Sequence, residues 1–221
     1  MEVMVTPDSE MADVVKAIQD SGIGDVVAER EVPPPPAIMD LKGIQNASVN
    51  GERPHMDSLR LPAVAQSLNL VLSSPNEVEG VVCEEMTITD ITDEHIDLTK
   101  RMLKLLAEIN GLGLAAPQIG LKKRFMVYWD TRQNMPYVCY NPKYYPSRHM
   151  VNWAEKCLTY GDLTFAVQRY KEVQAVWWEY DPDKKELVKM SKNLKGLQGE
   201  VFQHETDHLN GITISRGVLL R

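Results

Sequence analysis

The sequence predicts an α+β fold, in which segments with strand character precede and surround two helical segments. The first observation is a segment before residue 110 whose apolar residues recur every three or four positions. They are Leu98, Met102, Leu105, Leu106 and Ile109. The second is the alternation of Val173, Ala175 and Trp177, which is typical of a strand with one buried face. The third is Gly211, which would end a second helix running from about Asn193 to Asn210.

Residues 1–56 differ from the rest and are expected to form an extension. Met11, Val14, Val15 and Ile18 fall at helical spacing and predict one amphipathic helix from about Ser9 to Ser21. Four consecutive prolines, residues 33–36, then predict a stiff linker. The simpler expectation is that this helix packs on the main domain, and the alternative is that it docks a partner.

The main domain is expected to span residues 57–221. Thr92 or Asp93 would cap the first helix, which would continue to Asn110. The expected strands are Phe125–Trp129, Glu172–Tyr180 and, after a turn at Asp181–Lys185, Glu186–Met190. A short strand at Ile212–Ile214 would follow the second helix.

Composition and charge narrow the functional class. The formal net charge of −7 over 221 residues argues against a nucleic-acid or membrane-surface partner, because phosphate groups require a basic face. No apolar run is long enough to span a bilayer. Three cysteines give no disulfide framework, and residues 1–16 lack the pattern of a signal or transit peptide. A cytoplasmic location is therefore expected.

The strongest local signal is the segment His204-Glu205-Thr206-Asp207-His208. Two histidines at positions i and i+4 lie on one helix face, so both imidazoles can reach one metal ion. Glu205 is then placed to handle a proton of a water molecule that the metal activates. Two chance histidines on a solvated helix face would give the same pattern.

A catalytic metal site needs a third protein ligand. The position of a third histidine in long HExxH patterns is Ile214 here, and no Asp, Glu, His or Cys follows His208. The third ligand must therefore lie upstream, which argues against ordinary zinc proteases. The upstream candidates include His149, several carboxylates and three cysteines, namely Cys83, Cys139 and Cys157. Apolar neighbours favour buried structural thiols for Cys83 and Cys139, whereas Cys157 has charged and polar neighbours, as a ligand loop would.

Three segments together resemble the peptide deformylase family. Gly111–Gln118 has its Gly-x-Gly-x-Ala-Ala-x-Gln motif, Glu155–Thr159 is similar to Glu-Gly-Cys-Leu-Ser, and Gln203–Gly211 matches the third motif completely. The resemblance covers residues 57–221. It implies mixed or antiparallel sheets packed around a central HExxH helix.

The resemblance also implies a role for each matched residue. Cys157, His204 and His208 would bind the metal, usually Fe²⁺, with Zn²⁺, Ni²⁺ or Co²⁺ as substitutes. Glu205 would be the general acid and base, and the Gln118 side chain and the Leu158 backbone N–H would stabilise the oxyanion. Gly113, Leu158 and Leu197 would contact the substrate. The expected substrate is the formyl-methionyl end of nascent chains near the ribosome, and the expected enzyme is a monomer with no nucleic-acid or membrane partner.

This chain departs from the family pattern at four positions. Lys156 replaces a glycine, which either strains the backbone or adds positive charge near the site. Thr159 keeps the hydroxyl of the usual serine, and Gly161 stands where many members have proline. Glu200 is often aliphatic or basic in relatives and would disfavour acidic peptides if it lines the substrate groove.

Two other functions fit parts of the sequence. A silent metal-binding protein would need neither Gln118 nor Glu205, yet both are present. A zinc protease is disfavoured by Ile214 and by the absence of ligand residues after His208.

Overall fold

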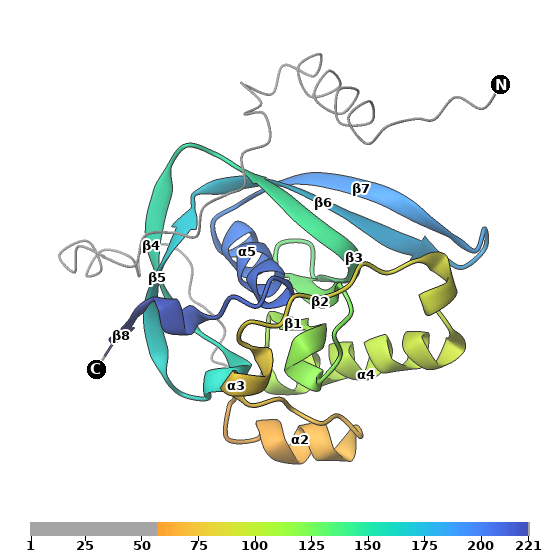
Figure 1. Cartoon of the computed structure of the whole chain (residues 1–221), viewed down its shortest axis with the longest axis horizontal. Helices are drawn as coiled ribbons and strands as arrows, with labels where there is room; N and C mark the ends of the chain where they lie inside the picture. Colours follow the sequence, from red (N-terminus) through yellow and green to blue (C-terminus); the bar gives the residue numbers. More distant parts are fainter. Residues whose placement is uncertain (1–56, 221) are drawn as a thin grey trace. The chain divides into compact units, whose positions relative to one another are not determined.

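The structure, a computed structural model, describes residues 57–220. The predicted helix at residues 9–21 and the proline linker therefore lie outside the described residues. In the described part, all strand pairs within the sheets are antiparallel, and helices pack beside them (Figure 1), which confirms the α+β prediction.

Two sheets form the framework. The five-stranded sheet has the order β1-β2-β3-β6-β7 and the three-stranded sheet has the order β4-β5-β8. The strands of the first sheet are β1 (Gly113–Ala115), β2 (Phe125–Asp130), β3 (Met135–Pro146), β6 (Glu172–Asp181) and β7 (Glu186–Lys195). Those of the second are β4 (Met150–Lys156), β5 (Thr164–Tyr170) and β8 (Val218–Leu220). Strands β1 and β4 each pair on one side only, so each leaves one edge available.

The helix predicted before residue 110 is α4 (Asp93–Ile109), and its ends follow the sequence signals. The Thr92 hydroxyl accepts a hydrogen bond from the His95 backbone N–H at 3.2 Å, as an N-cap does. Asn110 adopts the left-handed conformation that ends many helices. The inward face of α4 is fully buried, and each large apolar side chain there contributes roughly 1.5–3 kcal/mol.

Shorter helical segments complete the chain. They are α2 (Leu61–Ser67), α3 (Pro75–Val78) and the 3-10 turns η2 (Ile88–Asp90), η3 (Ala116–Ile119), η4 (Leu158–Tyr160) and η5 (Ile214–Arg216). Helix α2 packs with α4 and the first strands in one apolar cluster. A second cluster lies between the five-stranded sheet and the last helix, α5 (Leu197–Leu209).

Helix α5 begins later than predicted. Asn193–Lys195 continues β7, and Gly196 then turns the chain with a φ of +61° before the helix starts at Leu197. The predicted strand at Ile212–Ile214 was also wrong. Ile214 begins η5, and the strand that joins the second sheet is β8.

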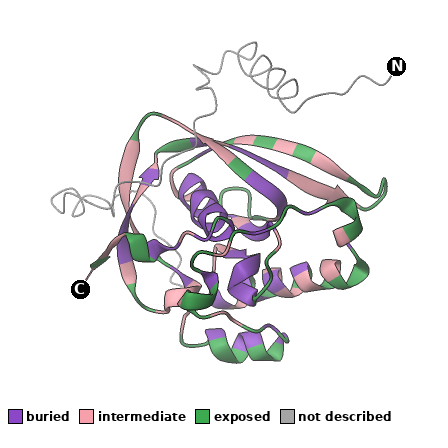
Figure 2. Ribbon diagram, in the orientation of Figure 1, coloured by how far each residue is buried: buried purple, intermediate pink, exposed green. Residues whose placement is uncertain are grey.

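Helix α5 is buried along almost its whole length, from residue 198 to residue 209 (Figure 2). It contacts strands of both sheets. Its polar groups must therefore find partners inside the protein. Gln203 illustrates this, because its amide exchanges two hydrogen bonds with the backbone of Tyr170 in β5, at 2.9 and 3.0 Å.

Among residues 57–220, no helix is long and apolar enough to cross a membrane.

Candidate metal centre and its pocket

Helix α5 brings the two predicted histidine ligands together. His204 and His208 lie one turn apart, and their Nε2 atoms are 3.2 Å apart. Both side chains are buried. Two nitrogen ligands on one tetrahedral ion with metal–nitrogen bonds of about 2.0–2.1 Å would be about 3.3 Å apart. The observed separation therefore suits a shared ion.

Cys157 completes a three-ligand cluster. It follows the end of β4, and its Sγ lies 3.2 Å from His208 Nε2. The ligand atoms of Cys157, His204 and His208 all lie within 4.8 Å of one another. Neither cluster of potential ligand atoms in the described part of the chain includes Cys83, Cys139 or His149.

The other cysteines lie as their apolar neighbours predicted. Cys83 and Cys139 are buried in the cluster between the five-stranded sheet and α5. Burial raises the pKa of the Cys83 thiol to about 11, and it also raises that of Cys139 well above the ordinary value. Both are therefore inert structural thiols.

The donor set fits a divalent transition metal. One thiolate and two imidazoles are ligands that zinc, iron and related ions accept, and a fourth position would remain for water or substrate. His204 Nδ1 donates a hydrogen bond to Glu155 Oε2 at 2.8 Å, so the Nε2 lone pair points to the other two ligands. His208 Nδ1 is buried without a partner among the described residues.

A buried ionic network supports the first histidine. Arg169 of β5 donates to both oxygens of Glu155, at 2.8 and 3.0 Å, and to Asp207 of α5. Burial alone would raise the pKa of the Glu155 carboxyl, but the charge of Arg169 and the hydrogen bonds from His204 and Arg169 hold it well below the ordinary value. Glu155 is therefore ionised, and it fixes the orientation of the His204 ring.

Sequence reasoning missed the role of Arg169. Its partners lie 14 and 38 residues away along the chain. No local spacing joins Arg169 to Glu155 and Asp207, although Glu155 and Asp207 both lie inside segments that the motifs had singled out.

Glu205 is buried beside this cluster, and its surroundings suit proton transfer. Burial, opposed in part by His204, raises the pKa of the Glu205 carboxyl to about 7. A general acid and base works best when its pKa lies near the working pH. The side chain packs directly on Gly113 of β1, where an added Cβ would lie 2.5 Å from Glu205 Cγ. The glycine thus makes room for the catalytic candidate, a reason that sequence reasoning had not given.

Gln118 reaches the cluster from η3, and both the oxygen and the nitrogen of its side-chain amide make hydrogen bonds. Its Oε1 accepts a hydrogen bond from the Ala115 backbone N–H at 2.8 Å. Its Nε2 donates to Thr159 Oγ1 at 3.1 Å and contacts Cys157 Sγ at 3.6 Å. The first bond fixes which end of the amide is the donor, so the N–H groups point toward the ligand cluster.

These groups share one cavity of about 270 Å³. It is lined from the α4–β1 turn by Asn110, Gly111, Leu112 and Gly113, from the other elements by Gln118, Ala154, Lys156, Cys157, Leu158 and Thr164, and from α5 by Glu200, Val201, His204 and Glu205. The predicted substrate contacts Gly113 and Leu158 are in this lining. Leu197 is not, because it packs, partly buried, against the cluster between sheet and helix.

Two of the departures from the family pattern have a structural explanation. Lys156 is the last residue of β4 and has no positive φ, so it adds charge without backbone strain. Gly161 has φ +61° and ψ −126°, a conformation that proline cannot adopt. Residue 161 therefore has a backbone conformation here that a proline at this position would exclude.

The buried thiolate–imidazole cluster, the adjacent carboxyl with a raised pKa and the amide donors define the class of this site as that of a metal-dependent hydrolase. Comparisons with known proteins identify the family. The profile of the polypeptide deformylase family matches residues 70–218. The chain belongs to this family, whose members are metal-dependent enzymes that remove the formyl group from the N-terminus of nascent peptides.

Individual relatives agree with this assignment. The chain is 36% identical over 124 residues to the peptide deformylase of Thermotoga neapolitana, a match that covers 55% of this chain and 71% of the relative. It is 32% identical over 145 residues to that of Aquifex aeolicus, covering 63% and 80%. The crystal structure of the Thermotoga maritima peptide deformylase is similar with a TM-score of 0.55 and 27% identity, over 67% of this chain and 97% of that one.

Proposed function

We propose that this chain hydrolyses the formyl group of formyl-methionyl peptides, using an ion bound by Cys157, His204 and His208. The observation that carries the proposal is that two of the three ligand residues, Cys157 and His204, line one cavity together with Glu205 and Gln118. A merely structural metal site would need neither Glu205 nor Gln118. The burial of α5 and its contacts with strands of both sheets support the proposal of a central HExxH helix.

Each residue of the site has a separate role in the proposed reaction. When bound, a divalent ion supplies Lewis-acid chemistry that activates a water molecule and polarises the formyl carbonyl. Glu205 takes a proton from that water as its oxygen attacks the formyl carbon. The Gln118 Nε2–H and the Leu158 backbone N–H donate to the developing oxyanion. Leu158 opens η4, and the first N–H groups of such a turn have no partner inside it.

The same carboxyl completes the reaction. Glu205 passes its proton to the peptide nitrogen as the carbon–nitrogen bond breaks. The products are formate and a peptide with a free amino terminus. The raised pKa of Glu205 suits both halves of this exchange, because the group must accept and release a proton at a similar pH.

The sheet edges suggest how a peptide would lie. Gly113 of β1 and Lys156 of β4 both line the cavity, and each belongs to a strand with one unpaired edge. An extended peptide can add to such edges through backbone hydrogen bonds. The substrate would then lie between β1 and β4 with its formyl end at the ligand cluster.

The remaining features of the proposal come from the family. We expect Fe²⁺ as the native ion, with Zn²⁺, Ni²⁺ or Co²⁺ able to replace it, since the donor set alone does not distinguish them. We also expect a monomer that works in the cytoplasm, near the ribosome, where formyl-methionyl chains emerge.

The test is formate release from a formyl-Met-Ala-Ser peptide by protein purified without oxygen and loaded with iron. Glu205→Ala should reduce release by at least about 10²-fold while metal content is unchanged. Full activity of that variant would refute the assigned role. No release by the wild-type protein would indicate a silent metal-binding protein, and cleavage of casein would indicate a protease.

A further inference from the structure

The Gln118 amide, the proposed oxyanion donor, bonds to a residue to which the mechanism gives no role. Its Nε2 donates a hydrogen bond to Thr159 Oγ1 at 3.1 Å, while its Oε1 accepts one from the Ala115 backbone N–H at 2.8 Å. The bond to Thr159 joins η3 to η4 across 41 positions of the chain. Thr159 does not line the cavity, so any effect that it has on the reaction must pass through another group.

The bond to Thr159 determines the direction of the Gln118 donor. A side-chain amide has two N–H groups, and it rotates about its last bond with little preference. The bond to Ala115 fixes the amide oxygen, but it leaves the plane of the amide free to turn. The bond to Thr159 engages one N–H and fixes the plane. The other N–H then faces Cys157 Sγ, 3.6 Å from Nε2, and the developing oxyanion can replace this long contact.

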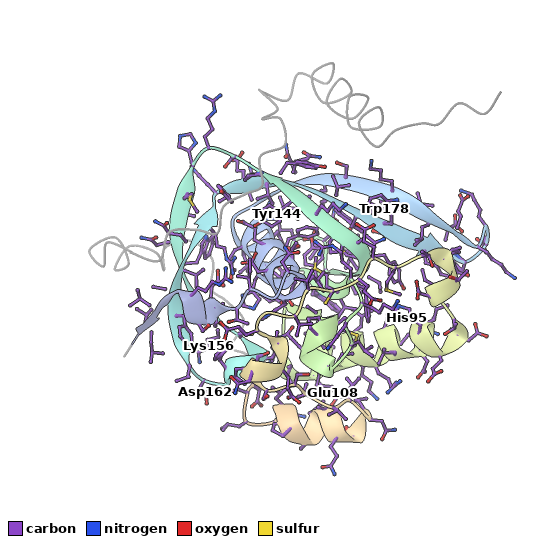
Figure 3. All side chains as sticks on the ribbon, viewed as in Figure 1. His95, Glu108, Tyr144, Lys156, Asp162 and Trp178 are labelled. Atoms are coloured by element: carbon purple, nitrogen blue, oxygen red, sulfur yellow. The ribbon has the colours of Figure 1, made fainter. Side chains whose placement is uncertain are left out.

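The turn that carries Thr159 has two hydroxyls, which bond in different directions. Thr159 Oγ1 accepts from the amide, whereas the Tyr160 hydroxyl lies 2.9 Å from Thr213 Oγ1 in the segment after α5. The residues at the two ends of this loop, Lys156 and Asp162, are labelled in Figure 3, and their Nζ and Oδ1 atoms are 3.7 Å apart. Neither Tyr160 nor Thr213 lines the cavity, so the Tyr160 hydroxyl provides a comparison within the same turn.

We propose that Thr159 is a positioning residue, whose hydroxyl orients the Gln118 amide so that one N–H points to the oxyanion before the substrate arrives. The inference rests on the proposed function and adds a residue to its machinery. Leu158, whose backbone N–H is the second proposed donor, precedes Thr159 in η4. The same turn thus supplies one donor and orients the other. Donors that are oriented in advance need not reorganise as charge develops on the substrate.

The simpler alternative is that Thr159 only satisfies a buried polar group. Gln118 is 2% exposed, and a buried N–H without an acceptor destabilises a protein. The two roles differ in their effect on catalysis. A purely stabilising bond changes the amount of folded protein, whereas a positioning bond changes kcat and acts only while the Gln118 amide is present.

The test replaces Thr159 with valine, which keeps the shape and removes the hydroxyl, and with serine, which keeps the hydroxyl. In iron-loaded protein acting on formyl-Met-Ala-Ser, Thr159→Val should lower kcat about tenfold, less than the about 10²–10³-fold that loss of a whole donor costs. KM should not change, because the bond to the oxyanion is made only in the transition state. Thr159→Ser should behave like the wild-type protein.

Two comparisons separate positioning from a general loss of structure. In a Gln118→Ala background, Thr159→Val should have little further effect on kcat, because the group that Thr159 orients is gone. Tyr160→Phe is the matched control, since it removes a hydroxyl that bonds to Thr213, and it should keep its kcat. The proposal is overturned if Thr159→Val has the wild-type kcat, if it costs as much without Gln118, or if Tyr160→Phe lowers kcat equally.

Exchange of the Gln118 side-chain N–H protons with water gives a readout without turnover. Their NMR signals in zinc-loaded protein are assigned by their loss in Gln118→Ala. Thr159→Val should speed the exchange of the N–H that bonds to Thr159, and Thr159→Ser should not. If the valine variant does not fold, Thr159→Ala replaces it in each comparison. Rapid exchange of both protons in the wild-type protein would refute the bond on which the proposal depends.

Failure of the proposed function would look different. No release of formate by the wild-type protein would refute the deformylase activity, while proton exchange would still show whether Thr159 holds the amide. Release of formate with the same kcat in the wild-type protein and in Thr159→Val would refute only the role of Thr159.

Discussion

Replacing Gly113 with alanine tests whether the fit between β1 and Glu205 sets the catalytic geometry. The added Cβ would lie 2.5 Å from Glu205 Cγ and 2.6 Å from Cδ, whereas ordinary contact begins at 3.4 Å. The carboxyl must therefore move by roughly 1 Å, and misplacement on that scale can cost about 10²-fold in rate. Overpacking should also lower the free energy of unfolding by about 1–3 kcal/mol.

The sign of the change in the free energy of unfolding shows whether the predicted clash between the added Cβ and Glu205 occurs. Gly113 has no positive φ, so without the clash alanine would stabilise the protein by about 0.4–1 kcal/mol. We expect kcat/KM for formyl-Met-Ala-Ser to fall about 10²-fold and the protein to lose stability in denaturant unfolding. In a Glu205→Ala background the same change should cost much less, because the obstructing carboxyl is gone.

Gly80→Ala is the matched control. Its φ of +78° makes alanine strained, yet the added Cβ meets nothing within 4 Å. It should lose about 1–2 kcal/mol of stability and keep its activity. If Gly113→Ala is as active as the wild-type protein and at least as stable, the steric reasoning is refuted.

Three further predictions concern stability. Arg169→Met should lower the free energy of unfolding by about 3–5 kcal/mol, because it leaves two buried carboxylates without their cation. A loss below about 1 kcal/mol in urea unfolding would contradict this. Gly211→Ala should lower the melting temperature markedly, since φ is +71° and the Cβ would lie 2.6 Å from the Gly80 carbonyl carbon. An unchanged melting temperature would exclude that clash. Burial opposes ionisation of Asp130, but the Lys192 ammonium and backbone N–H groups hold its pKa below the ordinary value. The stability that it contributes should be present above about pH 4 and vanish as the pH falls below its folded pKa. The difference between wild-type and Asp130→Asn unfolding, measured from pH 7 to pH 2, should shrink accordingly, and a constant difference would contradict the assignment.

Local patterns predicted those parts of the fold whose causes are local. The apolar stripe and the Thr92 cap defined α4, and the alternation from residue 172 defined β6. Strand β3 was missed because it contains Pro136, Pro142 and several polar residues, and its pairing with β2 and β6 compensates for them. The start of α5 was misplaced because the turn at Gly196, not helical propensity, decides where β7 ends.

In the site, too, local patterns predicted the features with local causes and missed those that depend on packing. The histidine spacing alone predicted that His204 and His208 face one point, since one turn of helix dictates it. Choosing Cys157 among three cysteines needed the surrounding motif. The contact between Gly113 and Glu205, and the support of His204 through Glu155 and Arg169, depend on how four separate elements pack. No spacing along the chain encodes such contacts.

The burial of α5 has a consequence for how this sequence can change. Helix α4 shows one face to water, so the positions on that face are open to substitution (Figure 2). Helix α5 has no such face, and several of its polar residues bond to neighbouring strands, Gln203 and Asp207 to β5 and His204 to β4. A change there must be matched by a change elsewhere, so α5 can diverge only through paired substitutions, whereas α4 can drift one residue at a time.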